Sequence, residues 1–400
     1  MQNLLILTVG TGTAGKKSDL AQGLLNTIEK IQPRKFWLVP STSEISQNIT
    51  KYIVDYINEF GGNPGFAGRL GPIEKPDDLS CCRQTLRKAI RAVKQELLRG
   101  EKLIVNPTSG TKQMSAGATI AALDEECGDI VFTIGERADG VVKTGTEQVV
   151  KFDSVAYFRE RDCNTAAEFF RAGDFYAAER LLYPHREREQ KAYALAAVCL
   201  HWRRFDYSHA ASFAATCDQE LKKCLTLRRD VVRECRFCEE IVADIMAWAR
   251  FALRCNDFED AVRLVYKALE YVARVFLERD FKLSPDANGM YPSDTGDILN
   301  LSSTCRKQLR SGTDKLALGL SLITAILKDL KHPFGEVIDK KLLKLSQLRN
   351  QNTHGILPVE KEKAESYYAN VQDKLGKLFP GFKPTDLPVK DLPFADKEHA

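Results

Sequence analysis

The sequence lacks the features of a membrane protein and of a strongly charged one. It has no apolar run that approaches the ~18 to 20 residues of a membrane-spanning helix. Its charges nearly balance, since 58 Lys and Arg stand against 54 Asp and Glu in 400 residues. The N-terminal MQNLLILTVGTG has no basic leader and no small-residue cleavage site, so it predicts a first β-strand rather than a signal peptide. This composition is typical of a globular chain of two or three domains. No overall charge bias indicates a nucleic-acid or membrane partner, so any such surface must be local.

The eleven cysteines show no pattern of a disulfide framework. Cys235 and Cys238 form a CxxC pair, but no second ligand pair accompanies it, so packing as small hydrophobic side chains is favoured over a zinc or redox site. Reduced thiols without an export signal predict a cytoplasmic protein.

The first part of the chain alternates strands with helices. LLILTVG, KFWLVPS, EKLIVNPT and GDIVFTIGE read as strands, and amphipathic helical segments lie between them. This alternation predicts an α/β Rossmann-like domain over residues 1–154, with a parallel-rich sheet covered by helices on both faces. Ligands of such sheets bind beyond the carboxyl ends of the strands.

After about residue 160 the pattern is helical. The motif D-aromatic-x-x-A recurs from Asp174, Asp206 and Asp257, which predicts three helix corners and a tetratricopeptide-like connector over residues 155–250. An all-α domain is expected over residues 251–400, beginning with a long amphipathic helix from Phe258. Its proline-rich tail after residue 380 either docks as an extended strap or stays mobile.

The first glycine-rich turn follows the first strand. Gly10, Thr11, Gly12, Thr13, Ala14 and Gly15 match the pattern GxGxxG. A dinucleotide fold also needs an acidic residue at the end of its second strand, whereas this strand ends Val39-Pro40-Ser41. NAD binding is therefore disfavoured, and the turn suits a phosphate or the edge of a nucleotide.

The second turn is Asn106-Pro107-Thr108-Ser109-Gly110-Thr111-Lys112-Gln113-Met114. It follows a hydrophobic strand and opens a helix, so free N–H groups, hydroxyls and a lysine gather at a helix N-terminus, as in anion sites. Asn106 and Thr111 stand where a Walker A loop has glycine, and no Ser or Thr follows Lys112. The turn predicts nucleotide binding without ATP hydrolysis; a tight turn with an exposed lysine is the structural alternative.

A Rossmann-like domain with VGTGT after its first strand and NPTSGTKQM after a later one resembles the CARF domains of CRISPR-associated proteins. In that family the two loops, from both subunits of a dimer, hold a cyclic oligoadenylate second messenger. The resemblance implies that Gly10, Thr11, Gly12, Thr13, Thr108, Ser109, Gly110, Thr111, Lys112 and Met114 line the pocket, with Lys112 near phosphate or base. Some members also cleave their ring-shaped ligand, which the sequence does not decide.

Near the C-terminus the segment LRNQNTHG carries an Arg-x4-His pair, Arg349 and His354. The same spacing occurs at Arg180/His185 and Arg204/His209, where helix-end packing and capping explain both residues. Around Arg349, in contrast, a run of polar residues interrupts an amphipathic helix before Gly355. Five helical residues turn through about 500°, so the two side chains point about 140° apart. A composite site between two copies of the chain is therefore expected.

This segment, together with DAVRLVYKALE in an earlier helix, resembles the HEPN ribonucleases, which cut RNA without a metal at a composite dimer site. The resemblance assigns His354 to proton transfer or 2′-hydroxyl orientation, Arg349 to phosphate charge and Asn350 to positioning.

CARF followed by HEPN is a known pairing. It implies a homodimeric accessory ribonuclease of type III CRISPR defence. Such a protein needs no metal, is activated by a cyclic oligoadenylate and cleaves single-stranded RNA. Two other classes stay open: a nucleotide sensor or interaction protein without nuclease activity, and a small-molecule Rossmann enzyme. The absence of a ribose carboxylate and of a catalytic acid or base near the turns counts against the latter.

Overall fold

The computed structural model describes residues 3–12, 17–60, 67–138, 141–309, 315–338, 342 and 357–395. The chain divides into two compact units, Met1–Glu160 and Arg161–Ala400. Helix α5 (Ser154–Ala172) begins in the first unit and continues into the second.

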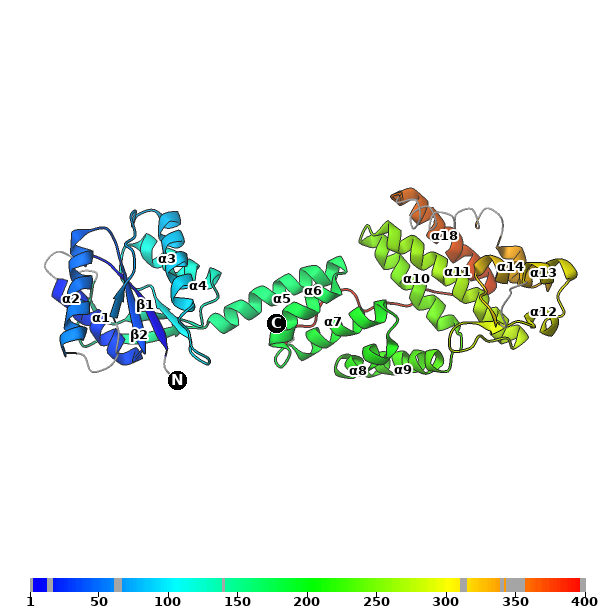
Figure 1. The fold of residues 1–400 in the computed structure, drawn as a ribbon, viewed down its shortest axis with the longest axis horizontal. Coiled ribbons are helices and arrows are strands. Elements are labelled where there is room, and N and C mark those ends of the chain that lie inside the picture. The colour runs from blue at the N-terminus through cyan, green and yellow to red at the C-terminus, as the bar shows by residue number, and fades with distance from the viewer. Residues whose placement is uncertain are drawn as a thin grey trace. The chain divides into compact units, whose positions relative to one another are not determined.

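The first unit is built on one six-stranded sheet with the strand order β3-β2-β1-β4-β5-β8 (Figure 1). Strands β3, β2, β1, β4 and β5 pair in parallel, and the edge strand β8 is antiparallel to β5. The short strands β6 and β7 pair with each other in antiparallel orientation. The strands are β1 (Leu4–Val9), β2 (Lys35–Pro40), β3 (Ala67–Arg69), β4 (Leu103–Asn106), β5 (Asp129–Ile134), β6 (Arg137–Ala138), β7 (Val141–Val142) and β8 (Gln148–Phe152).

Helices cover both faces of this sheet, because alternate strand residues are apolar toward opposite sides. On strand β1, Leu5 and Leu7 pack in the core of α1 (Lys17–Ile31) and α2 (Glu44–Phe60). Leu4 and Ile6 pack instead in the core of α3 (Leu79–Lys94) and α4 (Lys112–Asp124). Figure 1 shows these two helix layers with the strands between them.

The second unit consists almost entirely of helices. They are α6 (Phe175–Leu182), η1 (Tyr183–His185), α7 (Gln190–Arg203), α8 (Tyr207–Cys217), α9 (Gln219–Arg233), α10 (Glu239–Arg254), α11 (Phe258–Phe281), α12 (Thr295–Ile298), α13 (Ser303–Gln308), α14 (Leu320–Asp329), α15 (Pro333–Val337) and α18 (Lys361–Leu378). Short strands β9 (Tyr291–Pro292) and β10 (Lys315–Leu316) pair with each other.

The three helix corners predicted from the D-aromatic motif are confirmed. Asp174, Asp206 and Asp257 are the N-cap residues of α6, α8 and α11, and each side chain accepts a hydrogen bond from the backbone N–H three residues on. The aromatic residue after each aspartate is the first residue of its helix, and Phe175 and Tyr207 are buried there.

A buried carboxylate joins several elements of this unit. Asp244 of α10 is fully buried and forms an ion pair with Arg228 of α9, whose Nε lies 2.6 Å from the Asp244 Oδ2. Trp202 and Tyr207 also donate to Oδ2, from 3.0 and 3.1 Å, and the Thr385 hydroxyl donates to Oδ1. The network fixes α9 and the chain near residue 385 against α10.

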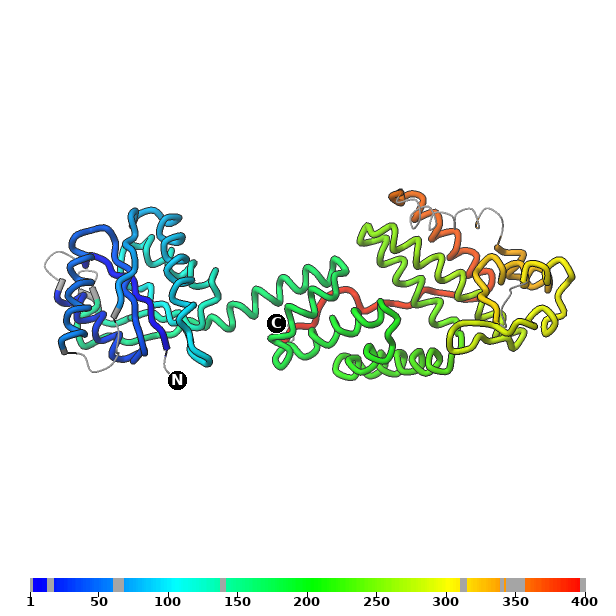
Figure 2. Tube along the Cα trace, in the orientation of Figure 1, coloured from blue at the N-terminus to red at the C-terminus, as the bar shows by residue number. Residues whose placement is uncertain are grey.

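The proline-rich segment docks as an extended strap. Between residues 379 and 395 it runs from the end of α18 back along α10 toward α7, in red in Figure 2. Val389, Leu392 and Phe394 are buried in the core of the unit. At its far end the Ala395 N–H donates to Glu189, 206 positions earlier, at 2.9 Å. The strap alternative of the sequence analysis is therefore the confirmed one.

The predicted fold class, a Rossmann-like domain followed by helices, is confirmed by this architecture. The division of residues 161–400 into a connector and a C-terminal domain stays a prediction, since these residues form one compact unit. In the described ranges no helix has both the length and the apolar character that a membrane crossing requires.

Candidate functional site

The two glycine-rich turns lie side by side because their strands do. Strands β1 and β4 are parallel neighbours, so the turns after Val9 and after Asn106 leave the sheet at the same edge. The Gly10 N–H donates to the Ser109 Oγ at 3.0 Å. A Cβ on Gly10 would lie 2.6 Å from the Gly110 Cα, so only glycine permits this approach of the two backbones.

The second turn is fixed by its own side chains. The Thr108 N–H donates to Asn106 Oδ1 at 3.0 Å, and Thr108 Oγ1 accepts from the Thr133 N–H of β5 at 2.7 Å. Thr111 is the N-cap of α4, where its Oγ1 accepts from the Met114 N–H at 3.1 Å. Gly110 has a φ of +126°, a conformation that favours glycine. The loop is therefore preorganised, with its geometry set before any ligand arrives.

A cavity of about 360 Å³ opens beside these turns. One wall is a single face of α1, which carries Asp19, Leu20, Gly23, Leu24 and Thr27. The remaining lining residues come from the two turns, from β5 and β7, and from the position just before β8: Gly10, Thr11, Gly12, Thr108, Ser109, Gly110, Thr111, Thr133, Val142 and Glu147.

Most of the residues assigned to the pocket from the sequence lie at this cavity. Gly10, Thr11 and Gly12 line it, as do Thr108, Ser109, Gly110 and Thr111. Two others have different surroundings: Met114 is buried in the core behind Gly110, and Lys112 is exposed on the first turn of α4, outside the lining. Thr13 lies outside the described residues. Ligand contact stays a prediction for the whole set.

Eight lining residues were not assigned from the sequence, and three of them are buried polar residues. Thr27 and Thr133 are buried, with their hydroxyls 3.1 Å apart, and Thr133 Oγ1 also accepts from Asn106 Nδ2 at 2.9 Å. Glu147, just before β8, is buried as well. Each is a single polar residue without a motif around it, so no pattern could mark it. Glu147 and Asp19 place two acidic side chains at the cavity, although the sequence analysis found no catalytic acid or base near the turns.

The predicted catalytic residues Arg349, Asn350 and His354 lie outside the described residues. The two pairs with the same spacing have structural partners. His185 Nε2 lies 3.0 Å from Asp162 Oδ2, and His209 Nδ1 lies 2.7 Å from Oδ2 of Asp206, the N-cap of α8. Both findings agree with their assignment to structure.

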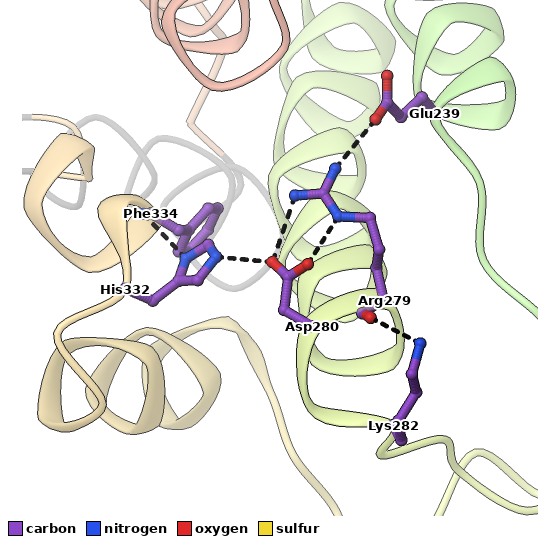
Figure 3. A network of polar contacts seen from close by, with 6 residues as sticks. All are labelled: Glu239, Arg279, Asp280, Lys282, His332 and Phe334. Atoms are coloured by element: carbon purple, nitrogen blue, oxygen red, sulfur yellow. Dashed lines mark hydrogen bonds and ion pairs between the residues drawn. The ribbon is translucent and has the colours of Figure 1, made fainter.

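One more histidine of the second unit is bound within a polar network (Figure 3). His332 is the N-cap of α15, and its Nδ1 accepts from the Phe334 N–H at 3.1 Å. Its Nε2 therefore carries the proton and donates to Asp280 Oδ2 at 2.9 Å. Arg279 hydrogen-bonds the same carboxylate and, with His332, holds the pKa of Asp280 below its usual range.

Both ring nitrogens of His332 are thus engaged, which assigns this residue to the structure of the unit. The network joins α11 to α10 as well, since Arg279 Nη1 lies 3.2 Å from Glu239 Oε1. It anchors α15, which precedes the LRNQNTHG segment in the chain.

No protein-family model matches this chain, and no curated protein matches it in sequence. Among solved structures it is similar to Enterococcus italicus Csm6 bound to cyclic hexa-2'-fluoro-hexa-dAMP. The match has a TM-score of 0.61 and covers 96% of this chain and 96% of that one, at 12% identity. The chain has the fold of Csm6.

The Csm6 fold extends over both units and not over the sheet alone. The resemblance to CARF–HEPN proteins, which the sequence analysis based on two short motifs, is therefore confirmed at the level of fold.

Proposed function

We propose that this chain is a CARF–HEPN ribonuclease that binds a cyclic oligoadenylate in the cavity beside its two glycine-rich turns. The observation that carries the proposal is this cavity, with preorganised amides and hydroxyls at the carboxyl edge of the sheet, in a chain with the Csm6 fold. The Csm6 structure holds a cyclic hexanucleotide analogue.

The chemistry of the lining suits the uncharged polar edge of a nucleotide as well as a phosphate. The Gly110 and Thr111 backbone opens α4, whose N-terminus favours an anion. Leu20, Leu24 and Val142 supply apolar surface for a flat ring.

The second part of the proposal is the cleavage of single-stranded RNA by Arg349 and His354. A histidine with an ordinary pKa near 6.5 exchanges a proton with the attacking 2′-hydroxyl or the leaving oxygen at neutral pH. The Arg349 guanidinium stabilises the charge of the pentavalent phosphate. Neither step needs a metal ion. Because the two side chains diverge on a regular helix, two copies of the chain contribute to one site.

A cleavage assay tests both parts. Labelled single-stranded RNA is incubated with the protein in EDTA, with and without cyclic oligoadenylates of four and six nucleotides. We expect cleavage that the ligand stimulates and that His354→Ala lacks. The matched control is His209→Ala, since Arg204 and His209 have the same spacing but His209 pairs with Asp206, the N-cap of α8.

Three outcomes contradict the proposal at different points. Equal cleavage by His354→Ala and the wild type shows that the site assignment is wrong. Cleavage that no cyclic oligoadenylate stimulates refutes the allosteric part. Ligand binding without any RNA cleavage favours a nucleotide sensor without nuclease activity over a ribonuclease.

A further inference from the structure

Glu147 differs from every other lining residue of the cavity because it places a buried carboxylate there. Only 2% of the residue is exposed. The cavity runs along one face of α1 from Asp19 to Thr27, a distance of about 12 Å for eight residues. Glu147 contacts α1 at Gly23 and Asn26, at least one helical turn beyond Asp19. The carboxylate therefore lies farther along α1 than Asp19, which is near the N-terminal end of this helix.

Two donors fix the orientation of the carboxylate. Oε1 accepts from Asn26 Nδ2 at 3.1 Å, and Oε2 accepts from the Gly145 N–H at 2.8 Å. Asn26 is itself held, since its Oδ1 accepts from Gln22 Nε2 at 2.9 Å. Gly23 lies beside the carboxylate, since a Cβ built on it would be in ordinary contact with Glu147 Oε1, at 3.5 Å. Each carboxylate oxygen can accept two hydrogen bonds, so one acceptor position on each remains for a ligand.

The charge of Glu147 has no counter-ion within the ranges that the structure describes. Lys30 donates to the backbone carbonyl of Glu147 and not to its carboxylate. A buried carboxylate without a cation is costly, and a ligand that supplies an N–H donor reduces this cost. A phosphate group has the opposite effect, since like charges repel at short range. The carboxylate thus favours a ligand orientation in which the phosphate lies near the amides of the turns. An N–H donor of the ligand then lies near Glu147 inside the cavity.

We infer that Glu147 recognises the exocyclic amino group of an adenine base of the ligand and sets the base specificity of the cavity. Adenine brings an N–H donor on a flat apolar ring, which matches a cavity lined by a carboxylate and by the apolar Leu20, Leu24 and Val142. This inference rests on the proposed function, because it assumes that a cyclic oligonucleotide occupies the cavity.

The test compares two ligands that differ only in that amino group. Cyclic hexaadenylate and tetraadenylate are measured beside the same rings built from purine, which has hydrogen in place of the amine. The wild type should bind the adenine rings about tenfold to a hundredfold more tightly, as for a hydrogen bond to a charged group. In Glu147→Ala this preference should fall to within about threefold, and Glu147→Gln should be intermediate, because its carbonyl is a neutral acceptor.

Asp19→Asn is the matched control, since it removes another negative charge from the same cavity. It should shift the affinities for adenine and purine rings in parallel. Thermal unfolding of each Glu147 variant shows whether the fold is kept, and Glu147→Gln keeps the side-chain length should the alanine variant unfold.

The possible failures are distinguishable. If the wild type binds adenine and purine rings equally, this inference is wrong while the ligand class of the proposed function stands. If the Glu147 variants bind both rings more weakly but keep the preference for adenine, Glu147 only holds the loop before β8 in place. That result also overturns the inference. If the wild type binds neither ring, the proposed ligand is refuted together with the inference.

Discussion

Replacing Gly10 by alanine should separate the two turns that form the cavity. A Cβ at this position would lie 2.6 and 2.7 Å from the Cα and N of Gly110. Ordinary contact begins near 3.4 Å, so the backbones must move apart by about 0.8 Å. Gly110 has little room to move, because the side chain of the buried Met114 packs closely against it. The methyl group therefore meets backbone atoms and not the end of a flexible side chain.

The cost follows from two effects. Overpacking against a rigid backbone typically costs about 1 to 3 kcal/mol. The Gly10 N–H also loses its bond to Ser109 Oγ, which is worth about 0.5 to 1.5 kcal/mol. We expect Gly10→Ala to destabilise the first unit by about 2 to 4 kcal/mol and to weaken cyclic oligoadenylate binding at least tenfold.

Native-state hydrogen exchange of the peptides that carry β1 and β4 measures the local stability, and calorimetry measures the ligand affinity. The control is Gly71→Ala, since a Cβ at Gly71 has no described atom within 4 Å and its backbone is not in a left-handed conformation. If Gly10→Ala matches Gly71→Ala in both measurements, the close approach of the two turns is not what shapes the cavity.

Three further changes test other parts of the chain. Asp244→Ala leaves a buried guanidinium unpaired and should destabilise the second unit by about 3 to 5 kcal/mol in chemical denaturation, whereas the exposed Asp386→Ala should cost at most about 1 kcal/mol. His332→Ala removes the cap of α15 and should cost about 0.5 to 2 kcal/mol; the acceptor in His332→Asn should recover part of this loss. The pKa of Glu101 is lowered to about 2 by its hydrogen bond with Arg34, so the stabilisation is complete above about pH 4.5 and lost toward pH 2. Acid unfolding of Glu101→Gln should show a smaller pH dependence over this range, and an unchanged profile would contradict the assignment.

The sequence predicted the parts of the site that local chemistry determines. A glycine-rich turn between a hydrophobic strand and a helix has few geometries, so Gly10 and Gly110 could be assigned without a structure. Parallel pairing then brings the two turns to one edge. The proline-rich segment could be recognised as non-helical, but its docking depends on side chains more than a hundred positions away.

The rest of the cavity could not be predicted because distant segments build it. Strand β8 is mostly exposed, so it lacks the apolar alternation that marks a strand, and the residues around Glu147 read as a loop. Its partner Asn26 stands on α1, 121 positions earlier. For Lys112 and Met114 the motif alone was misleading. It places both residues in the turn region, but on helix α4 Lys112 is exposed to solvent and Met114 is buried in the core.

The docked strap has a consequence for the synthesis of the second unit. Residues 382–394 contribute Phe394 and Leu392 to a core that begins with α5, and Asp391 lies 3.3 Å from Arg171, 220 positions earlier. A ribosome therefore releases the helices long before the segment that closes over them. Until then Asp244 lacks the Thr385 hydroxyl, and apolar surface on α10 stays uncovered. A chain cut short before the strap thus yields an incompletely closed helical unit.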